Sequence, residues 1–367
     1  MQPLLSEVRS LTITFLIAFV IGYLFKHLGL PAPFLLGSLF GVWFFGGTIR
    51  SVRERLAVPR WVFVPVALGL GTLIGGNFRP DVIAHLGAAA VTVSTMVGAT
   101  ILATLVGLTY LMKVRKYSFM MALLSCIPGG QAEAVLMSRD LVEKDYVVAL
   151  FHLVRVAIVF CSTPLILALV QGEAAVVAST IALEAMPSAS SLDMNTLFVF
   201  ASVSICSLPL AQLLRIPMPH LVGPILISSA LHIAGLIEVP RISEFVILAQ
   251  LTIGGSVGAR LAKVPFVELA PYIRDAVTNS ILVLMTYGLL ALAISRITDI
   301  NFIQLLLAFV PGGLYEVTLL ALIFGFDVAF VAFHHTIRVM MVCIGLPLIA
   351  GFAQKHQANS KKTNPPT

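Results

Sequence analysis

Long apolar stretches recur along almost the whole chain, and they constrain its fold more than any other feature. Each is roughly 17–25 residues long, enough for a helix to cross a hydrocarbon core of about 30 Å. Of the 367 residues, 59% are hydrophobic and 11% are charged, whereas an ordinary soluble domain carries about 25% charged residues. This composition excludes a soluble domain, and the lack of alternating strand patterns argues against a membrane barrel. The sequence predicts an all-α integral membrane protein with the lipid bilayer as its main partner.

The apolar stretches predict ten membrane-spanning helices, five in each half of the chain. These helices are expected near residues 9–28, 31–46, 60–76, 87–112 and 145–170, and near residues 197–214, 217–236, 242–259, 276–295 and 328–352. In each half a further apolar segment lies between the last two helices, and Pro-Gly-Gly interrupts it. The first stretch is followed by Lys26 and His27 rather than by a small-residue cleavage site, so we expect a retained span and not a signal peptide.

The two halves share one signature at a constant spacing. Pro128, Gly129, Gly130, Glu133, His152, Arg155 and Pro164 recur as Pro311, Gly312, Gly313, Glu316, His335, Arg338 and Pro347, all at an offset of 183 residues. Matched Glu, His and Arg residues in so apolar a chain indicate an internal duplication. We predict repeats at residues 1–170 and 197–354, an extracytoplasmic linker at 171–196 and a disordered cytoplasmic tail at 355–367.

The distribution of Lys and Arg bears on how the two repeats are oriented. If each Pro-Gly-Gly segment enters and leaves on one side as a re-entrant hairpin, a repeat has five crossings and the second copy is inverted. Hairpins with a cytoplasmic N-terminus place 17 Lys and Arg inside and 4 outside, whereas broken helices that cross the membrane give 13 and 8. Because cytoplasmic loops carry the excess of Lys and Arg, the counts favour inverted repeats with both termini cytoplasmic, without excluding crossing segments.

The Pro-Gly-Gly breaks are the first candidate binding elements. Proline removes a backbone donor and glycine frees the backbone, so the broken helix leaves polar groups that are tolerated only in protein or beside a cavity. Broken helices at matching positions of two inverted repeats indicate a transporter's binding site. Glu133 and Glu316 fall in the first turn of the following half-helix. Each carboxylate either caps that helix end or carries protons or cations.

The His-x-x-Arg motif supplies the remaining candidate residues. His152 and Arg155 share one helix face, as do His335 and Arg338. Each Arg either pairs with a hairpin Glu or attracts an anionic group, and each His could relay protons. The candidate solute and ion site consists of Pro128, Gly129, Gly130, Gln131, Glu133, His152, Arg155, Pro311, Gly312, Gly313, Tyr315, Glu316, His335 and Arg338.

Other features indicate packing rather than chemistry. The net charge of +6 arises from Lys and Arg in short loops and not from a basic arm, so nucleic acid is not an expected partner. The four cysteines stand singly within apolar runs, and no metal-ligand spacing or phosphate loop is present. We expect no cofactor and no metal. Glycine clusters near Gly71 and Gly254 predict close helix approach.

With its paired P-G-G-x-x-E and H-x-x-R motifs, the chain resembles the bacterial AbrB-duplication membrane family over residues 9–354. The resemblance implies a multi-pass protein of the bacterial inner membrane. Labels used for that family mention regulation of gene expression and ammonia oxidation, and neither activity follows from these residues. A soluble AbrB DNA-binding hairpin has no counterpart in this sequence.

The leading functional hypothesis is a secondary transporter or exporter of a small solute, coupled to protons or cations such as Na⁺. Arginines beside helix N-termini favour an anionic solute. A membrane-embedded regulator of gene expression is the alternative, and a monooxygenase-type enzyme finds less support because the chain shows no metal-ligand motif. The sequence favours a non-enzyme and leaves a homo-oligomer open.

Overall fold

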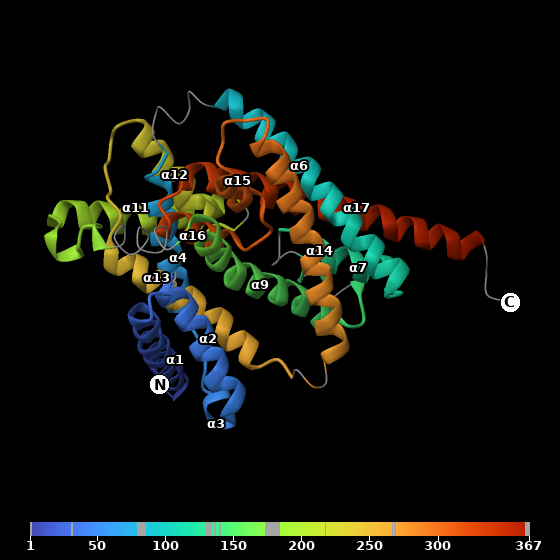
Figure 1. Cartoon of the computed structure of the whole chain (residues 1–367), viewed down its shortest axis with the longest axis horizontal. Helices are drawn as coiled ribbons and strands as arrows, with labels where there is room; N and C mark the ends of the chain where they lie inside the picture. The colour runs from blue at the N-terminus through green and yellow to red at the C-terminus, as the bar shows by residue number, and fades with distance from the viewer. Residues whose placement is uncertain are drawn as a thin grey trace.

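The fold is known from a computed structural model that describes residues 2–363, apart from 31, 79–85, 130–133, 136, 139–140, 173–183, 217, 266 and 268. Within these residues every regular element is helical and no strand is formed, so the all-α prediction is confirmed (Figure 1). Seven of the described helices are long and apolar enough to cross a membrane. They are α1 (Gln2–His27), α6 (Leu86–Thr109), α9 (Asp145–Gln171), α11 (Met194–Leu213), α13 (Ser243–Ala262), α14 (Ala270–Ser295) and α17 (Val328–Thr363).

Three shorter apolar helices occupy the other places where spans were predicted. They are α2 (Pro33–Thr48), α4 (Arg60–Gly75) and α12 (Val222–Ile233). At 16, 16 and 12 residues, they extend about 18–24 Å, less than a hydrocarbon core of about 30 Å. A helix is therefore present at all ten predicted places, and the length needed for a simple crossing is reached at seven. The short helix α3 (Arg50–Arg53) and the 3₁₀ turn η2 (Ala189–Ser191) belong to connections.

The most exposed long helices are apolar on their outer faces. In the 18-residue apolar stretch of each helix, 17% of the residues are buried in α1 and 22% in α11, whereas 72% are buried in α13. Large side chains such as Leu16, Phe19 and Phe198 are exposed on α1 and α11. Contiguous apolar surface of this kind is unfavourable in water but suits contact with lipid tails.

The two halves of the chain pack against each other through reciprocal contacts. By sequence offset, α2 corresponds to α12 and α4 to α13. The structure packs α2 against α13 and α4 against α12. Thus α2 contacts the counterpart of α4, and α4 contacts the counterpart of α2. In the same way, α1 contacts α13, and its counterpart α11 contacts α4. Mutual exchange of equivalent contacts is the pattern of an isologous, two-fold interface.

Glycines make the crossing of these helices close. A Cβ atom added at Gly71 or Gly75 of α4 would lie 2.7 Å from a carbonyl oxygen of α12 or of the residue before it. At the matching Gly254 and Gly258 of α13 it would lie 2.7 and 2.6 Å from carbonyl oxygens of α2. No side chain fits at such distances, so the predicted role of the glycine clusters in close packing is confirmed.

Short helices end at the Pro-Gly-Gly motifs of both halves, and those of the second half lie in the middle of the molecule (Figure 1). In the second half, α15 (Phe302–Phe309) ends just before Pro311-Gly-Gly, and α16 (Leu314–Ile323) begins after it. In the first half, α7 (Phe119–Cys126) has the same bounds as α15 at the offset of 183 residues. Each piece has 8 to 10 residues, so none of them alone extends across a hydrocarbon core.

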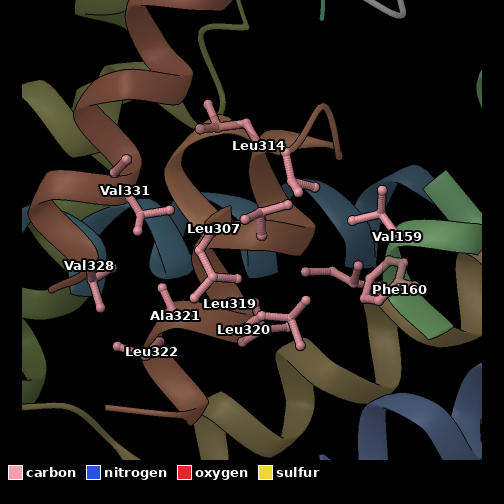
Figure 2. Close-up of a cluster of buried hydrophobic side chains, with 14 of the residues drawn as sticks. Val159, Phe160, Leu307, Leu314, Leu319, Leu320, Ala321, Leu322, Val328 and Val331 are labelled. Carbon is pink, nitrogen blue, oxygen red and sulfur yellow. The ribbon is translucent and has the colours of Figure 1, made fainter. Parts of the chain in front are cut away.

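Apolar side chains hold the broken segment of the second half in place. Val159 and Phe160 of α9, Leu307 of α15 and Leu319 and Leu320 of α16 are buried in one cluster (Figure 2). Val328 and Val331 of α17 close the cluster on its other side. Helices of both halves therefore fix the break.

Helix α17 differs from expectation at its C-terminal end. A disordered tail was predicted from residue 355, but the helix continues to Thr363. The segment contains Ala, Gln and Lys, which are good helix formers, and no Gly or Pro interrupts it before Pro365. Extending an existing helix avoids the cost of nucleation.

Candidate functional site

The His-x-x-Arg motif of the second half binds the end of α15. His335 and Arg338 lie on α17 and are buried. The guanidinium of Arg338 donates to the carbonyl oxygens of Phe309 and Val310 at 2.7 and 3.1 Å. His335 Nε2 lies 2.9 Å from the carbonyl oxygen of Leu307, and its Nδ1 lies 2.7 Å from Arg338 Nη2. The motif thus ties together the last free carbonyls of a half-helix that stops at Pro-Gly-Gly.

The first half repeats this arrangement on equivalent residues. Arg155 of α9 donates to the carbonyl oxygen of Cys126 at 3.3 Å, and its Nη2 lies 2.8 Å from His152 Nδ1. His152 Nε2 lies 2.9 Å from the carbonyl oxygen of Leu124. Every one of these residues is 183 positions before its counterpart. The duplication therefore extends from sequence to side-chain hydrogen bonding.

These bonds determine the protonation of both histidines. A carbonyl oxygen only accepts and a guanidinium only donates, so each ring carries its proton on Nε2 and accepts at Nδ1. Neither nitrogen of His152 or His335 is left for a relay in this arrangement. Glu316 forms no ion pair with Arg155 or Arg338 within the described residues. Pairing of either Arg with Glu133, which lies outside those residues, stays a prediction. Their charge is balanced by the negative end of a half-helix.

The Pro-Gly-Gly segment of each half contacts the motif helix of the other half. A Cβ atom on Gly129 would lie 3.6 Å from both Arg338 Nε and Val342 of α17. A Cβ atom on Gly312 would lie 3.0 Å from Val159 of α9, the equivalent of Val342. Gly129 has a φ of 97°, a conformation that side chains disfavour. Each Pro-Gly-Gly break thus contacts the arginine helix of the other half, meaning the helix that carries His-x-x-Arg (α9 or α17).

A cavity of about 680 Å³ lies where these elements meet. Its wall includes Gly129 and Arg155 from the first half and Pro311, Gly312, Gly313 and Glu316 from the second. Arg155 and Glu316 are both buried. These six candidate residues form part of the wall of one cavity. Pro128, His152, His335 and Arg338 are described but are not part of that wall.

Glu316 occupies the first turn of α16, as predicted. Its carboxylate lies over Gly313, the residue just before the helix, so that a side chain at Gly313 would overlap it. One carboxylate oxygen, Oε2, is buried and has no hydrogen-bond partner among the described residues. The position suits a helix cap, and Glu316 also belongs to the cavity wall.

Four of the predicted site residues cannot be placed in full. Gly130, Gln131 and Glu133 lie outside the described residues. The backbone of Tyr315 belongs to α16, and its side chain lies outside the description. The predicted roles of these four residues stay predictions.

Three basic residues on the cavity wall were missed by sequence reasoning. They are His220, Arg260 and Lys263, of which Arg260 and Lys263 are exposed. The two cations were counted only as loop charges that report orientation. Their long side chains reach the cavity because α13 ends beside it, a proximity that no spacing in the sequence reveals.

Asp275 forms a second polar cluster that the sequence analysis did not single out. It is buried in α14, and its Oδ1 lies 2.7 Å from Arg115 Nε in an ion pair, while Tyr117 donates to its Oδ2 at 3.0 Å. The Asp275 carboxylate raises the pKa of Arg115, and burial together with that carboxylate raises the pKa of Tyr117. The available signal was an acid at the start of an apolar run, because ionisable residues that enter a span are by default functional or paired.

Comparison with known proteins gives one family. A family model described as "Transition state regulatory protein AbrB" matches residues 39–354. A Bacillus subtilis strain 168 protein named "Uncharacterized protein YhjN" is 24% identical over 84% of this chain and 87% of its own length. The "Putative regulator AbrB" of Escherichia coli strain K12 is 24% identical over 90% of this chain and 92% of its own length.

Proposed function

The chain belongs to the AbrB family, and we propose that it is a secondary transporter that moves a small solute across the bacterial inner membrane, coupled to protons or cations. One observation carries the proposal: Gly129 of the first Pro-Gly-Gly and all three residues of the second lie on the wall of a single cavity, next to a buried Arg and a buried Glu. Discontinuous helices and ionisable groups at the interface of two repeats are typical of solute sites in secondary transporters.

Inverted repeats with two re-entrant hairpins are part of this proposal. The reciprocal packing of α2 with α13 and of α4 with α12 supports a two-fold relation between the halves. The bias of Lys and Arg supports an axis in the membrane plane, since inversion places most of them on one side. In that arrangement the N- and C-termini are cytoplasmic and the two breaks enter from opposite faces.

Glu316 is the proposed coupling group. Its carboxylate is buried at the start of α16, on the cavity wall, with an unpartnered oxygen. A carboxyl group in such a place can take up a proton at low cost, because the charged form lacks solvation. Glu133 holds the matching position in the first half and is assigned the same role.

Reconstitution into liposomes tests the coupling role. The purified protein is expected to acidify or alkalinise the lumen when a solute gradient is imposed, and Glu316→Gln should abolish this proton-coupled flux while leaving the protein folded. Asp327→Asn removes an exposed carboxylate at the start of α17 and serves as the matched control. Unchanged flux in Glu316→Gln would refute the coupling role.

Regulation of gene expression is the second candidate, and the names of the family and of the Escherichia coli relative favour it. It predicts a transcriptional phenotype in cells lacking the protein, with no measurable flux. Rescue of that phenotype by Glu316→Gln, together with absence of flux for the unaltered protein, would favour regulation over transport.

A further inference from the structure

We propose that the cavity between the two halves binds an organic monoanion, with the acidic group at Arg155 and an apolar body against the aliphatic wall. This inference rests on the proposed transport function and names its class of solute. The shared chemistry is a single negative charge, such as a carboxylate or sulfonate, joined to a small hydrophobic group.

Arg155 provides the anchor. Its side chain is 3% exposed and lies on the cavity wall. Nη1 and Nη2 are engaged with Cys126 and His152, but Nε is buried and has no partner among the described residues. A guanidinium cannot be deprotonated in proteins, and a buried donor without a partner is costly. A ligand oxygen at Nε would satisfy this donor and supply the opposite charge.

The charge of the wall selects for an anion. The described lining contains three cationic side chains, Arg155, Arg260 and Lys263, and one carboxyl group, that of Glu316. Arg260 and Lys263 are exposed and lie towards solvent, where they can steer anions to the opening. A cationic solute such as ammonium would meet a net positive wall. An uncharged sugar would leave the Arg155 donor opposite a hydroxyl, a weaker partner than a carboxylate.

The remaining wall limits the rest of the ligand. Leu150, Leu153, Val156, Leu314 and Val339 are buried and contribute only aliphatic carbon beyond their backbones. A second negative charge placed against these residues would lose its hydration without gaining a partner. The volume of about 680 Å³ is in the range of small-molecule sites. The wall beside these residues therefore favours an apolar body over a second charged group.

The same cavity links anion binding to proton binding. Glu316 lies on the wall that would face the bound anion. Two like charges in one poorly solvated site repel, so the bound anion favours the protonated form of the Glu316 carboxyl group. By reciprocity, protonation of Glu316 strengthens anion binding. One monoanion and one proton would then move together without net charge.

Radiolabelled benzoate binding to the full-length protein in detergent, read by scintillation proximity, tests the site. Benzenesulfonate should displace the label, while succinate should require at least tenfold higher concentration and ammonium and glucose should not compete. Arg155→Gln should weaken benzoate binding at least tenfold and Arg155→Lys less. Lys113→Gln, which removes one exposed cation away from the cavity, should bind as the unaltered protein does. Equal displacement by all four competitors would overturn the proposal.

A volume variant covers the case in which Arg155→Gln fails to fold. Leu153→Trp places a large side chain into the apolar part of the cavity and should weaken benzoate binding at least tenfold, whereas full binding would overturn the assigned site.

An anionic phospholipid that copurifies and is not displaced by benzoate would assign the cavity to lipid and overturn the proposed solute. Flux of a cationic or neutral solute that depends on Glu316, without benzoate binding, would refute this inference but not transport. Benzoate binding without flux of any solute would refute transport alone.

Discussion

Among the described residues, backbone carbonyl oxygens and not carboxylates accept hydrogen bonds from the arginine of each repeated motif. Arg338 and Arg155 bind the ends of α15 and α7, which lie 28 to 29 residues earlier in the chain. The sequence indicated that His-x-x-Arg is important and that a buried charge needs a partner. It could not indicate this partner, because a carbonyl oxygen belongs to every residue type.

His335 tests whether this arrangement is structural. Alanine at this position removes both the donor to Leu307 and the acceptor for Arg338, so the free energy of unfolding should fall by about 2–4 kcal/mol. Glutamine can donate and accept at once, and His335→Gln should retain most of the stability. Thermal unfolding in detergent measures both variants. A stable His335→Gln protein without proton coupling would instead support a relay.

Asp275 leads to a second prediction at this scale. Asp275→Asn leaves Arg115 without its ionic partner, and the free energy of unfolding should fall by about 1–3 kcal/mol, less than for a fully buried pair because Arg115 is partly exposed. The double variant Asp275→Asn, Arg115→Gln should regain part of the loss, because it removes the orphaned charge. A double variant as unstable as the sum of the single variants would show that the pair does not interact.

At the scale of elements, the sequence predicted helices well and contacts poorly. Apolar length located all ten helices, and Pro-Gly-Gly located the break between α15 and α16. Two short helices, α2 and α4, were correctly placed because flanking polar residues end their apolar runs. The pairing of α2 with α13 was invisible, since no local pattern specifies which distant helix a glycine-rich face will meet.

The helix crossings predict different effects for two glycines. Gly75→Val would place side-chain atoms against Ile225 and Ser228 of α12, because even a Cβ would lie 2.7 Å from the Ile225 carbonyl oxygen. Gly98 of α6 has no atom within 4 Å of such a Cβ. We expect Gly75→Val to lower the yield and melting temperature of folded protein strongly, and Gly98→Val to change them little. Similar losses in both variants would mean that valine acts through helix propensity and not through the crossing.

At the scale of the whole molecule, duplication explains why one cavity is shared. Each half provides an arginine helix and a break, and each break contacts the arginine helix of the other half. Neither half alone could enclose the cavity that Arg155 and Glu316 line. The offset of 183 residues revealed the repeats from sequence. The differences between them required the fold: the basic residues Arg260 and Lys263 of the described cavity wall come from the second half.

The central claim is that the two halves are inverted and bring their breaks together from opposite faces. Lys144 and Asp327 are exposed, equivalent positions just after the two broken segments. In a background without the four native cysteines, Lys144→Cys and Asp327→Cys can be labelled in right-side-out and inverted membrane vesicles with an impermeant maleimide. Inverted repeats predict that residue 144 is labelled only from the cytoplasmic side and residue 327 only from the outside. Labelling of both positions from the same side would contradict the account.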